Sequence, residues 1–195
     1  MDTTIRPTIA LFTGDPAGIG PEIVNKLLGD GTASQAAEIV LITQQNTAHA
    51  PATVVLHEWQ GRNAPVFDAG VAQADNGQYM LEALAAGVDL VRSGKADAFC
   101  FAPLNKGALR MGGMHQEDEL RWFSEYMGFA GECGELNVLR NLWTARVTSH
   151  VALRDVSGLL TAENVANAIR MITEALRAAG VSRPRIAVCG LNPHN

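Results

Sequence analysis

Two of the five histidines stand where a metal ion could be bound. His150 follows the strand-like segment ARVTS, and His194 follows the strand-like segment RIAVCG. In open α/β sheets, ligands bind beyond the carboxyl ends of the strands. Imidazole is a common ligand of divalent transition metals, which can polarise a substrate hydroxyl. The alternative is that each histidine is a hydrogen-bonded surface or cap residue, because their separation in the chain matches no short ligand motif.

A glycine-rich turn near the N-terminus is a second candidate. The string GDPAGIGPE starts at Gly14, directly after a predicted strand, and leads into a helix predicted to begin near Pro21. Glycines allow a ligand to approach the backbone, and a helix N-terminus favours anionic or polar groups. The spacing is neither the dinucleotide fingerprint nor a Walker A loop. The alternative is a strand-to-helix turn that needs glycines only for its geometry.

A lysine and an acidic cluster follow another predicted strand end. Lys106, in FAPLNKG, could hold a phosphate or carboxylate as a point charge. The alternative is a solvated loop lysine. Glu117, Asp118 and Glu119 fit the acidic first turn of a helix. If they instead line a pocket, they would bind hydroxyls or a cation and disfavour an anion.

The sequence around these residues alternates short apolar runs with longer stretches of helical period. This alternation predicts an α/β fold in which helices flank a largely parallel sheet. The predicted strands are Thr8–Thr13, Glu38–Thr43, Thr53–His57, Asp97–Ala102, Ala145–Ser149 and Arg185–Gly190. Besides the helix that begins near Pro21, the predicted helices are Ala74–Ser93, Asp118–Met127 and Ala162–Ala179, the last with Thr161 as its cap and Gly180 at its end.

Composition favours small-molecule chemistry. The chain has 195 residues, 47% of them hydrophobic, and a net charge of -5 without long charged runs, so we expect no nucleic-acid or membrane partner. No signal sequence or membrane span is predicted. Cys100, Cys133 and Cys189 are predicted to be buried thiols in a reducing compartment, so the expected location is cytoplasmic.

Four stretches carry a resemblance to a known family. TGDPAGIGPEI, FAPLNKG, VTSHVALRDVS and RIAVCGLNPH occur here in that order, and they resemble the 4-hydroxythreonine-4-phosphate dehydrogenase (PdxA) family of pyridoxal phosphate biosynthesis. The first stretch is also similar to the GDGIGPE turn of isopropylmalate and isocitrate dehydrogenases. The resemblance implies the fold of those enzymes, with NAD or NADP as cofactor.

The resemblance also implies site residues. His150 and His194 would bind a divalent metal ion (Zn, Mg, Co or Mn), and a third ligand would come from the other subunit of a homodimer, in a part that this chain does not contain. Lys106 would be catalytic and contact the substrate. A role near the cofactor is assigned to Gly14, Asp15 and Gly18.

The segment that follows Lys106 departs from the family pattern. The family usually shows Gly-His-Thr-Glu after the lysine, whereas counting from Lys106 without gaps places Asp118, Glu119 and Leu120 at the Gly-His-Thr positions. The nearest histidine, His115, is four residues early. We assign His115 and Glu119 as candidate substrate contacts and expect a relative with a different substrate.

The sequence therefore predicts that residues 1–195 are the N-terminal and central part of a two-domain dehydrogenase, incomplete at the C-terminus, with the internal boundary left open. The predicted reaction is oxidation, with decarboxylation, of a small phosphorylated hydroxy acid, such as 4-phosphooxy-threonine or a threonate or erythronate 4-phosphate. One alternative is a dihydrodiol dehydrogenase of the same family. The other is a non-catalytic truncated α/β domain or binding module.

Overall fold

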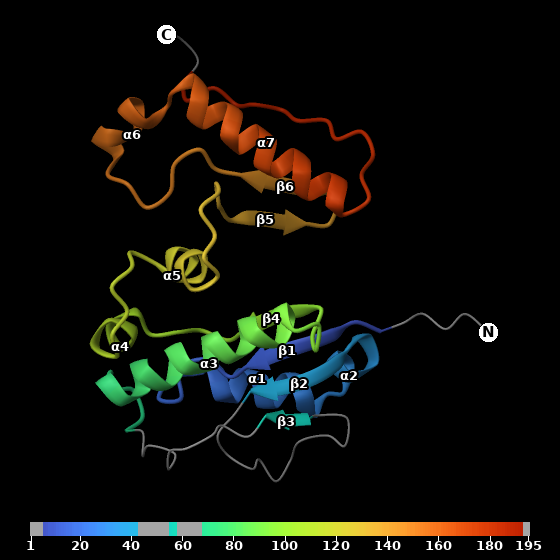
Figure 1. The fold of residues 1–195 in the computed structure, drawn as a ribbon, viewed down its shortest axis with the longest axis vertical. Helices are drawn as coiled ribbons and strands as arrows, with labels where there is room; N and C mark the ends of the chain where they lie inside the picture. Colours follow the sequence, from blue (N-terminus) through green and yellow to red (C-terminus); the bar gives the residue numbers. More distant parts are fainter. Residues whose placement is uncertain (1–5, 43–54, 58–67, 193–195) are drawn as a thin grey trace, which may run out of the picture. The chain divides into compact units, whose positions relative to one another are not determined.

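The computed structural model describes residues 6–42, 55–57 and 68–192, and the chain divides into two compact units (Figure 1). Unit 1 is Met1–Met127 and unit 2 is Gly128–Asn195.

Unit 1 is built on a parallel sheet of four strands in the order β3-β2-β1-β4, counted over the described residues. The strands are β1 (Thr8–Phe12), β2 (Glu38–Ile42), β3 (Val55–His57) and β4 (Ala98–Phe101). β1 lies inside the sheet, with Leu11 paired to Leu41 on one side and to Cys100 on the other. Because β1 and β4 are parallel neighbours, the segments that follow them leave the sheet at the same edge.

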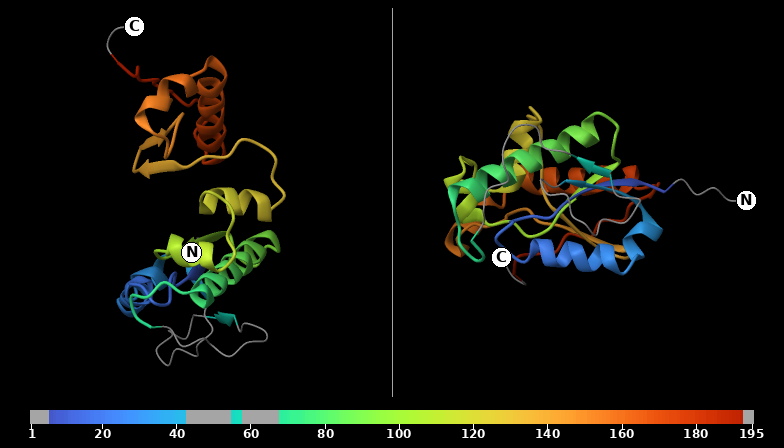
Figure 2. Two further views of the ribbon diagram at one scale, coloured as in Figure 1. Left: turned by 90° about the vertical axis from the view of Figure 1, so that its left-hand side faces the viewer. Right: turned by 90° about the horizontal axis from the view of Figure 1, so that it is seen from below.

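Helices cover both faces of this sheet. The helices of unit 1 are α1 (Gly20–Gly29), α2 (Thr32–Ala36), α3 (Ala74–Arg92), α4 (Lys106–Met111) and α5 (Glu119–Tyr126). Side chains alternate along a strand, so Ala10 and Phe12 pack with the α3 residues Met80 and Leu84, while Leu11 packs with Val24 of α1 in a second core. Figure 2 shows α1 and α3 on opposite sides of the sheet. The predicted parallel sheet flanked by helices is confirmed.

The long helix α3 runs close to its neighbours because two of its residues lack a side chain. A Cβ atom added at Gly77 would lie 1.8 Å from the Ala108 carbonyl oxygen of α4. One added at Gly87 would lie 2.3 Å from the Phe99 ring of β4. Past Ser93, the chain turns through Gly94, whose φ of 71° suits glycine. The end predicted at Ser93 is confirmed within one residue.

Unit 2 contains an antiparallel hairpin, β5 (Leu136–Leu139) and β6 (Leu142–Ala145), and two helices, α6 (Leu153–Leu159) and α7 (Ala162–Ala178). The hydroxyl of Thr161 accepts a hydrogen bond from the Asn164 amide at 3.1 Å and caps α7. Gly180 follows the helix with a φ of 90°. Both predicted ends of this helix are confirmed.

Two predicted strands of unit 2 need correction. The strand predicted at Ala145–Ser149 is replaced by β6, which ends at Ala145. The segment Arg185–Gly190 is not a strand, and Val188 is 60% exposed. A strand requires a hydrogen-bonded neighbour, and among the described residues β6 pairs only with β5 and this segment pairs with no strand. The apolar pattern of a segment does not show whether the folded chain gives it a strand to pair with.

The predicted burial of the cysteines is also wrong for two of the three. Cys100 and Cys189 are exposed, Cys133 is partly buried, and all are free thiols. Cys100 lies on edge strand β4 between the partly buried Phe99 and the exposed Phe101. An apolar run marks a strand without showing whether both of its faces are covered, which is why the prediction failed here.

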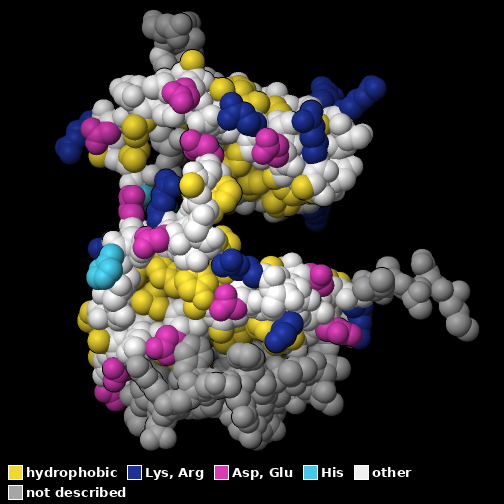
Figure 3. All heavy atoms as spheres, in the orientation of Figure 1, with side chains coloured by type: hydrophobic (Ala, Val, Ile, Leu, Met, Phe, Trp, Pro, Cys, Tyr) yellow, Lys and Arg dark blue, Asp and Glu magenta, His cyan; other side chains and the backbone are white. Residues whose placement is uncertain are grey.

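The surface carries apolar side chains singly and in groups, drawn in yellow in Figure 3. In unit 1 they include Phe101, Met111 and Tyr126, and in unit 2 Leu139 and Leu153. None of the helices described here is long and apolar enough to cross a membrane.

Candidate functional site

The glycine-rich turn after β1 packs directly against the end of β4. Gly14 has a φ of 78°, and a Cβ atom there would lie 2.5 Å from the Pro103 carbonyl oxygen. The backbone amide of Asp15 donates to that same oxygen at 3.0 Å. Only glycine combines this φ with so close an approach. Two segments that the sequence singled out, at Gly14 and at Lys106, are therefore neighbours in unit 1.

Asp15 is held inside the turn. Its side chain is 5% exposed, and Oδ1 accepts a hydrogen bond from the Ala17 amide at 3.0 Å. The Asp15 carbonyl oxygen accepts from the Gly18 amide, also at 3.0 Å. An aspartate that closes a turn in this way fixes the backbone path. The hydrogen bond of the Asp15 side chain is thus with its own turn, and the predicted role of Asp15 near a cofactor stays a prediction.

Gly20 belongs to the GDPAGIGPE string but is not one of the predicted cofactor residues, and it has as little space for a side chain as Gly14. A Cβ atom at Gly20 would lie 2.1 Å from the Thr13 carbonyl oxygen. α1 therefore begins against the residue that directly follows β1. The sequence does contain a signal for this close approach. Pro21 lies in the first turn of α1, so the glycine directly before it marks the start of the helix.

Lys106 is the first residue of α4, and its position is set by the residue before it. The Asn105 side chain accepts a hydrogen bond from the Ala108 amide at 3.1 Å, which caps the helix. The Lys106 ammonium lies 3.6 Å from Oε2 of Glu119. The lysine side chain is 57% exposed and that of Glu119 is 20% exposed. The predicted substrate lysine thus already faces a carboxylate of its own chain.

The acidic cluster separates into three different environments. Asp118 caps α5, because its Oδ1 accepts from the Arg121 amide at 2.8 Å. Glu119, the first residue of α5, faces Lys106. Glu117 is exposed. The alternative of an acidic helix start is confirmed for Asp118, which is the cap, and for Glu119, which lies in the first turn. Of the three residues, Glu119 is the one that also lies close to the candidate substrate lysine.

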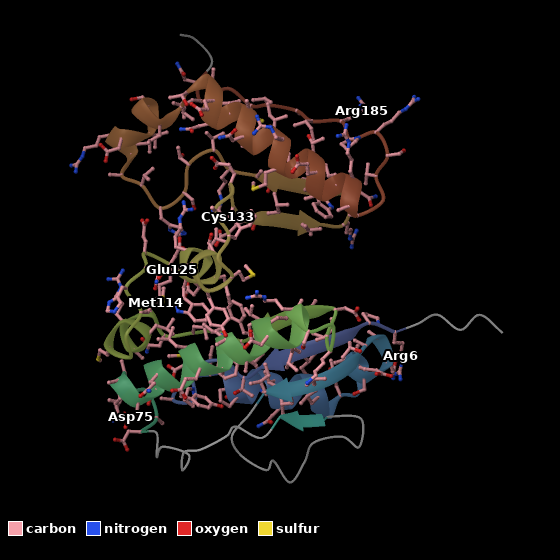
Figure 4. The ribbon with its side chains drawn as sticks, viewed as in Figure 1. Arg6, Asp75, Met114, Glu125, Cys133 and Arg185 are labelled. Carbon is pink, nitrogen blue, oxygen red and sulfur yellow. The ribbon has the colours of Figure 1, made fainter. Side chains whose placement is uncertain are left out.

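His115 lies in the loop that joins α4 to α5. The loop is anchored by the buried side chain of Met114 and by a 2.6 Å hydrogen bond from Gln116 to Glu125 (Figure 4). His115 itself is exposed, and its backbone amide donates to the Gln116 side chain at 3.2 Å. The structure gives no contact between His115 and Lys106, so its predicted substrate role stays a prediction.

The structure describes one of the two predicted metal ligands, His150. His150 is exposed and has a φ of 56°, unusual for a residue with a side chain. It lies on the loop before α6, five residues past the antiparallel strand β6 and not at the end of a parallel strand. His194 lies outside the described residues. Within the described ranges, no group of three or more His, Cys, Asp or Glu residues could hold a metal ion.

The exposed imidazole of His150 has the chemistry of a metal ligand. No hydrogen bond or ion pair engages the His150 ring among the residues that the structure describes, so its nitrogen atoms are available for coordination. One imidazole does not make a site, so the predicted metal binding by His150 and His194 stays a prediction.

Comparison with known proteins gives one consistent set of matches. The family model described as "Pyridoxal phosphate biosynthetic protein PdxA" matches residues 19–195. A protein of Pseudomonas aeruginosa with the provisional name 4-hydroxythreonine-4-phosphate dehydrogenase 2 is 46% identical over 100% of this chain and 65% of its own length. A protein of Bradyrhizobium diazoefficiens with the provisional name D-threonate 4-phosphate dehydrogenase is 33% identical over 95% of this chain and 60% of its own.

A solved structure matches the fold as well. The crystal structure of 4-hydroxythreonine-4-phosphate dehydrogenase from Klebsiella pneumoniae superposes with a TM-score of 0.81 at 27% identity, covering 98% of this chain and 65% of that one. The chain thus spans about two thirds or slightly less of the length of the relatives that it matches.

Proposed function

This chain belongs to the pyridoxal phosphate biosynthetic protein PdxA family, and we propose that the whole protein is a dehydrogenase of a small phosphorylated hydroxy acid. The names of the relatives support 4-hydroxythreonine-4-phosphate or D-threonate 4-phosphate as the substrate class. The structural observation that carries the proposal is the direct packing of the Gly14 turn against the segment that leads to Lys106. That packing puts two backbone segments suited to ligands at one edge of a parallel sheet.

The proposed reaction is an alcohol oxidation. The carbon that bears the hydroxyl gives a hydride to NAD or NADP, the hydroxyl loses its proton, and a ketone forms. If that ketone is β to a carboxylate, the carboxylate leaves as carbon dioxide. Lys106 contacts the substrate, and the Gly14–Gly18 turn lies beside the cofactor.

His150 and His194 hold a divalent metal ion in this proposal. When bound, such an ion stabilises an alkoxide as a Lewis acid. A further ligand from a partner subunit would make the protein a homodimer with a shared site. The available imidazole of His150 supports this assignment, and the expected location of the protein is cytoplasmic.

The proposal predicts the behaviour of His150→Ala in the full-length protein. We expect the affinity for Zn²⁺ or Mn²⁺ to fall by at least about 100-fold, because ligand removal exceeds the effect of losing an outer-shell partner, and we expect NADH formation to be lost. Metal affinity is measured by competition with a chelator, and NADH formation by absorbance with 4-hydroxythreonine-4-phosphate and D-threonate 4-phosphate.

The matched control is Ser149→Ala, an exposed neighbour on the same loop, which should keep both metal affinity and turnover. Unchanged metal affinity in His150→Ala would remove the metal assignment. A protein that binds metal and substrate but forms no NADH or NADPH would instead be a binding module, and the dehydrogenase proposal would be wrong.

A further inference from the structure

The ion pair between Lys106 and Glu119 bears on the charge of the substrate. We infer that Glu119 is a specificity-determining residue: it neutralises Lys106, so that the substrate group meeting this pair is an uncharged hydroxyl, and the anionic group of the substrate is bound elsewhere. The observation is the 3.6 Å separation of Lys106 Nζ from Glu119 Oε2. The inference rests on the proposed function, which assigns Lys106 to the substrate.

The backbone on both sides of the pair is held in place. Lys106 begins α4 behind the Asn105 cap, and Glu119 begins α5 behind the Asp118 cap. Glu119 is the less exposed partner, at 20% against 57% for Lys106. Since water screens an exposed charge more than a covered one, the carboxylate keeps its influence on any ligand that approaches the lysine.

The other carboxylates of the cluster do not share this role. Asp118 is engaged by a backbone amide at 2.8 Å, and Glu117 is exposed. Within the part of the chain that the structure describes, the member of the cluster that forms an ion pair with Lys106 is Glu119. A glutamine there would be nearly the same size without the charge.

The chemistry of the pair selects a hydroxyl. An ammonium group only donates hydrogen bonds, and a carboxylate only accepts them. A hydroxyl does both, so it satisfies Lys106 and Glu119 together. A phosphate satisfies only Lys106 and is repelled by Glu119, because like charges disfavour each other at short range.

Kinetics of the full-length protein test this inference with D-threonate 4-phosphate and D-threonate. Lys106→Gln should lower kcat/KM for both compounds by the same factor, since the lysine does not hold the phosphate. In Glu119→Gln the uncovered Lys106 should accept the phosphate itself. The preference for the phosphorylated compound, measured as the ratio of the two KM values, should then rise by about five- to ten-fold, as expected for removing one repulsive charge from a partly covered site. Glu119→Asp, which keeps the charge, should retain the preference of the natural protein.

The matched control is Glu117→Gln, which makes the same charge change two residues away and should leave the preference unchanged. The gain in Glu119→Gln should also disappear in the double variant Lys106→Gln/Glu119→Gln. The inference would be overturned if the gain in preference persisted without Lys106, or if Glu117→Gln gained equally. It would also be overturned if Lys106→Gln lowered kcat/KM for the phosphorylated compound alone.

Binding of inorganic phosphate, measured by calorimetry, separates this inference from the proposed reaction. Glu119→Gln should bind phosphate more tightly than the natural protein does, and only while Lys106 is present. If neither the natural protein nor any variant turned over substrate, the proposed function would be wrong, but phosphate binding by the same proteins would still test the role of Glu119. If Glu119→Gln did not bind phosphate more tightly in a Lys106-dependent way, the inference about Glu119 would be wrong.

Discussion

Tyr126 shows how one side chain joins two helices of unit 1. Its hydroxyl donates to Oδ2 of Asp89, on α3, at 3.0 Å, and its ring stacks on Trp122 at a centroid distance of 5.1 Å. Burial raises the pKa of the Tyr126 phenol above its ordinary value, and the hydrogen bond and negative charge of Asp89 raise it further, while Arg92 acts in the opposite direction. The phenol therefore keeps its proton to higher pH in the folded chain than in the unfolded one.

This shift predicts a pH dependence of stability. Above a pH of about 10 the unfolded chain loses the tyrosine proton first, so the free energy of unfolding should fall as the pH rises towards the folded pKa. Urea unfolding across this range should show a smaller fall in Tyr126→Phe. Asp89→Asn, which removes the charge but leaves the phenol, should bring the phenol pKa closer to its ordinary value in a spectrophotometric titration. An identical pH dependence in the natural protein and in Tyr126→Phe would contradict the assignment.

At the scale of the elements, glycines allow the backbones of α3 and α4 to approach closely. The missing Cβ atom of Gly77 leaves room for the Ala108 carbonyl oxygen, and Gly112 at the end of α4 faces the backbone of α3, where an added Cβ atom would lie 2.3 Å from the Gln78 nitrogen. α4 carries Lys106 at its first position. Close helix packing thus helps to set the position of the proposed substrate lysine.

Gly77→Ala should consequently destabilise unit 1 by about 1–3 kcal/mol, the usual cost of overpacking, because a backbone carbonyl has little freedom to move aside. Gly29→Ala is the matched control, since a Cβ atom at this helical glycine meets nothing within 4 Å. It should be neutral or slightly stabilising. Urea denaturation compares the two, and equal effects would show that α3 and α4 can separate at no cost.

At the scale of the whole molecule, the two units differ in how much of each is buried. Among the described residues, the buried hydrophobic side chains of unit 1 include Phe12, Met80 and Leu84, whereas Ile172 of α7 is the one found in unit 2. The stability of a segment follows the apolar surface that it buries. Unit 2 of this chain, taken by itself, has little such surface.

Hydrogen–deuterium exchange of the 195-residue chain should therefore be faster in unit 2. Amides of β5, β6 and α7 should exchange ahead of those of β1 and α3, because local opening costs less where few apolar contacts are lost. Peptides from α1, another amphipathic helix but packed on the large sheet, provide the comparison for α7. Equal protection of α1 and α7 would show that unit 2 has a source of stability other than its own core.

Local patterns along the chain were enough to predict several of its features. The period of apolar residues and the caps located α3, α5 and α7 to within one or two residues. Alternating strand and helix patterns indicated the parallel sheet, and the motif strings indicated the family. These features depend on neighbours in the chain, so a single sequence contains them.

The tertiary structure alone decided which distant residues meet. It paired Lys106 with Glu119, separated Asp118 and Glu117 from that pair, and placed the Gly14 turn against Pro103. It also replaced two predicted strands, at Ala145–Ser149 and Arg185–Gly190, because a strand exists only where a partner offers hydrogen bonds. Pairing, packing and burial depend on residues far apart in the chain, and no local pattern specifies them.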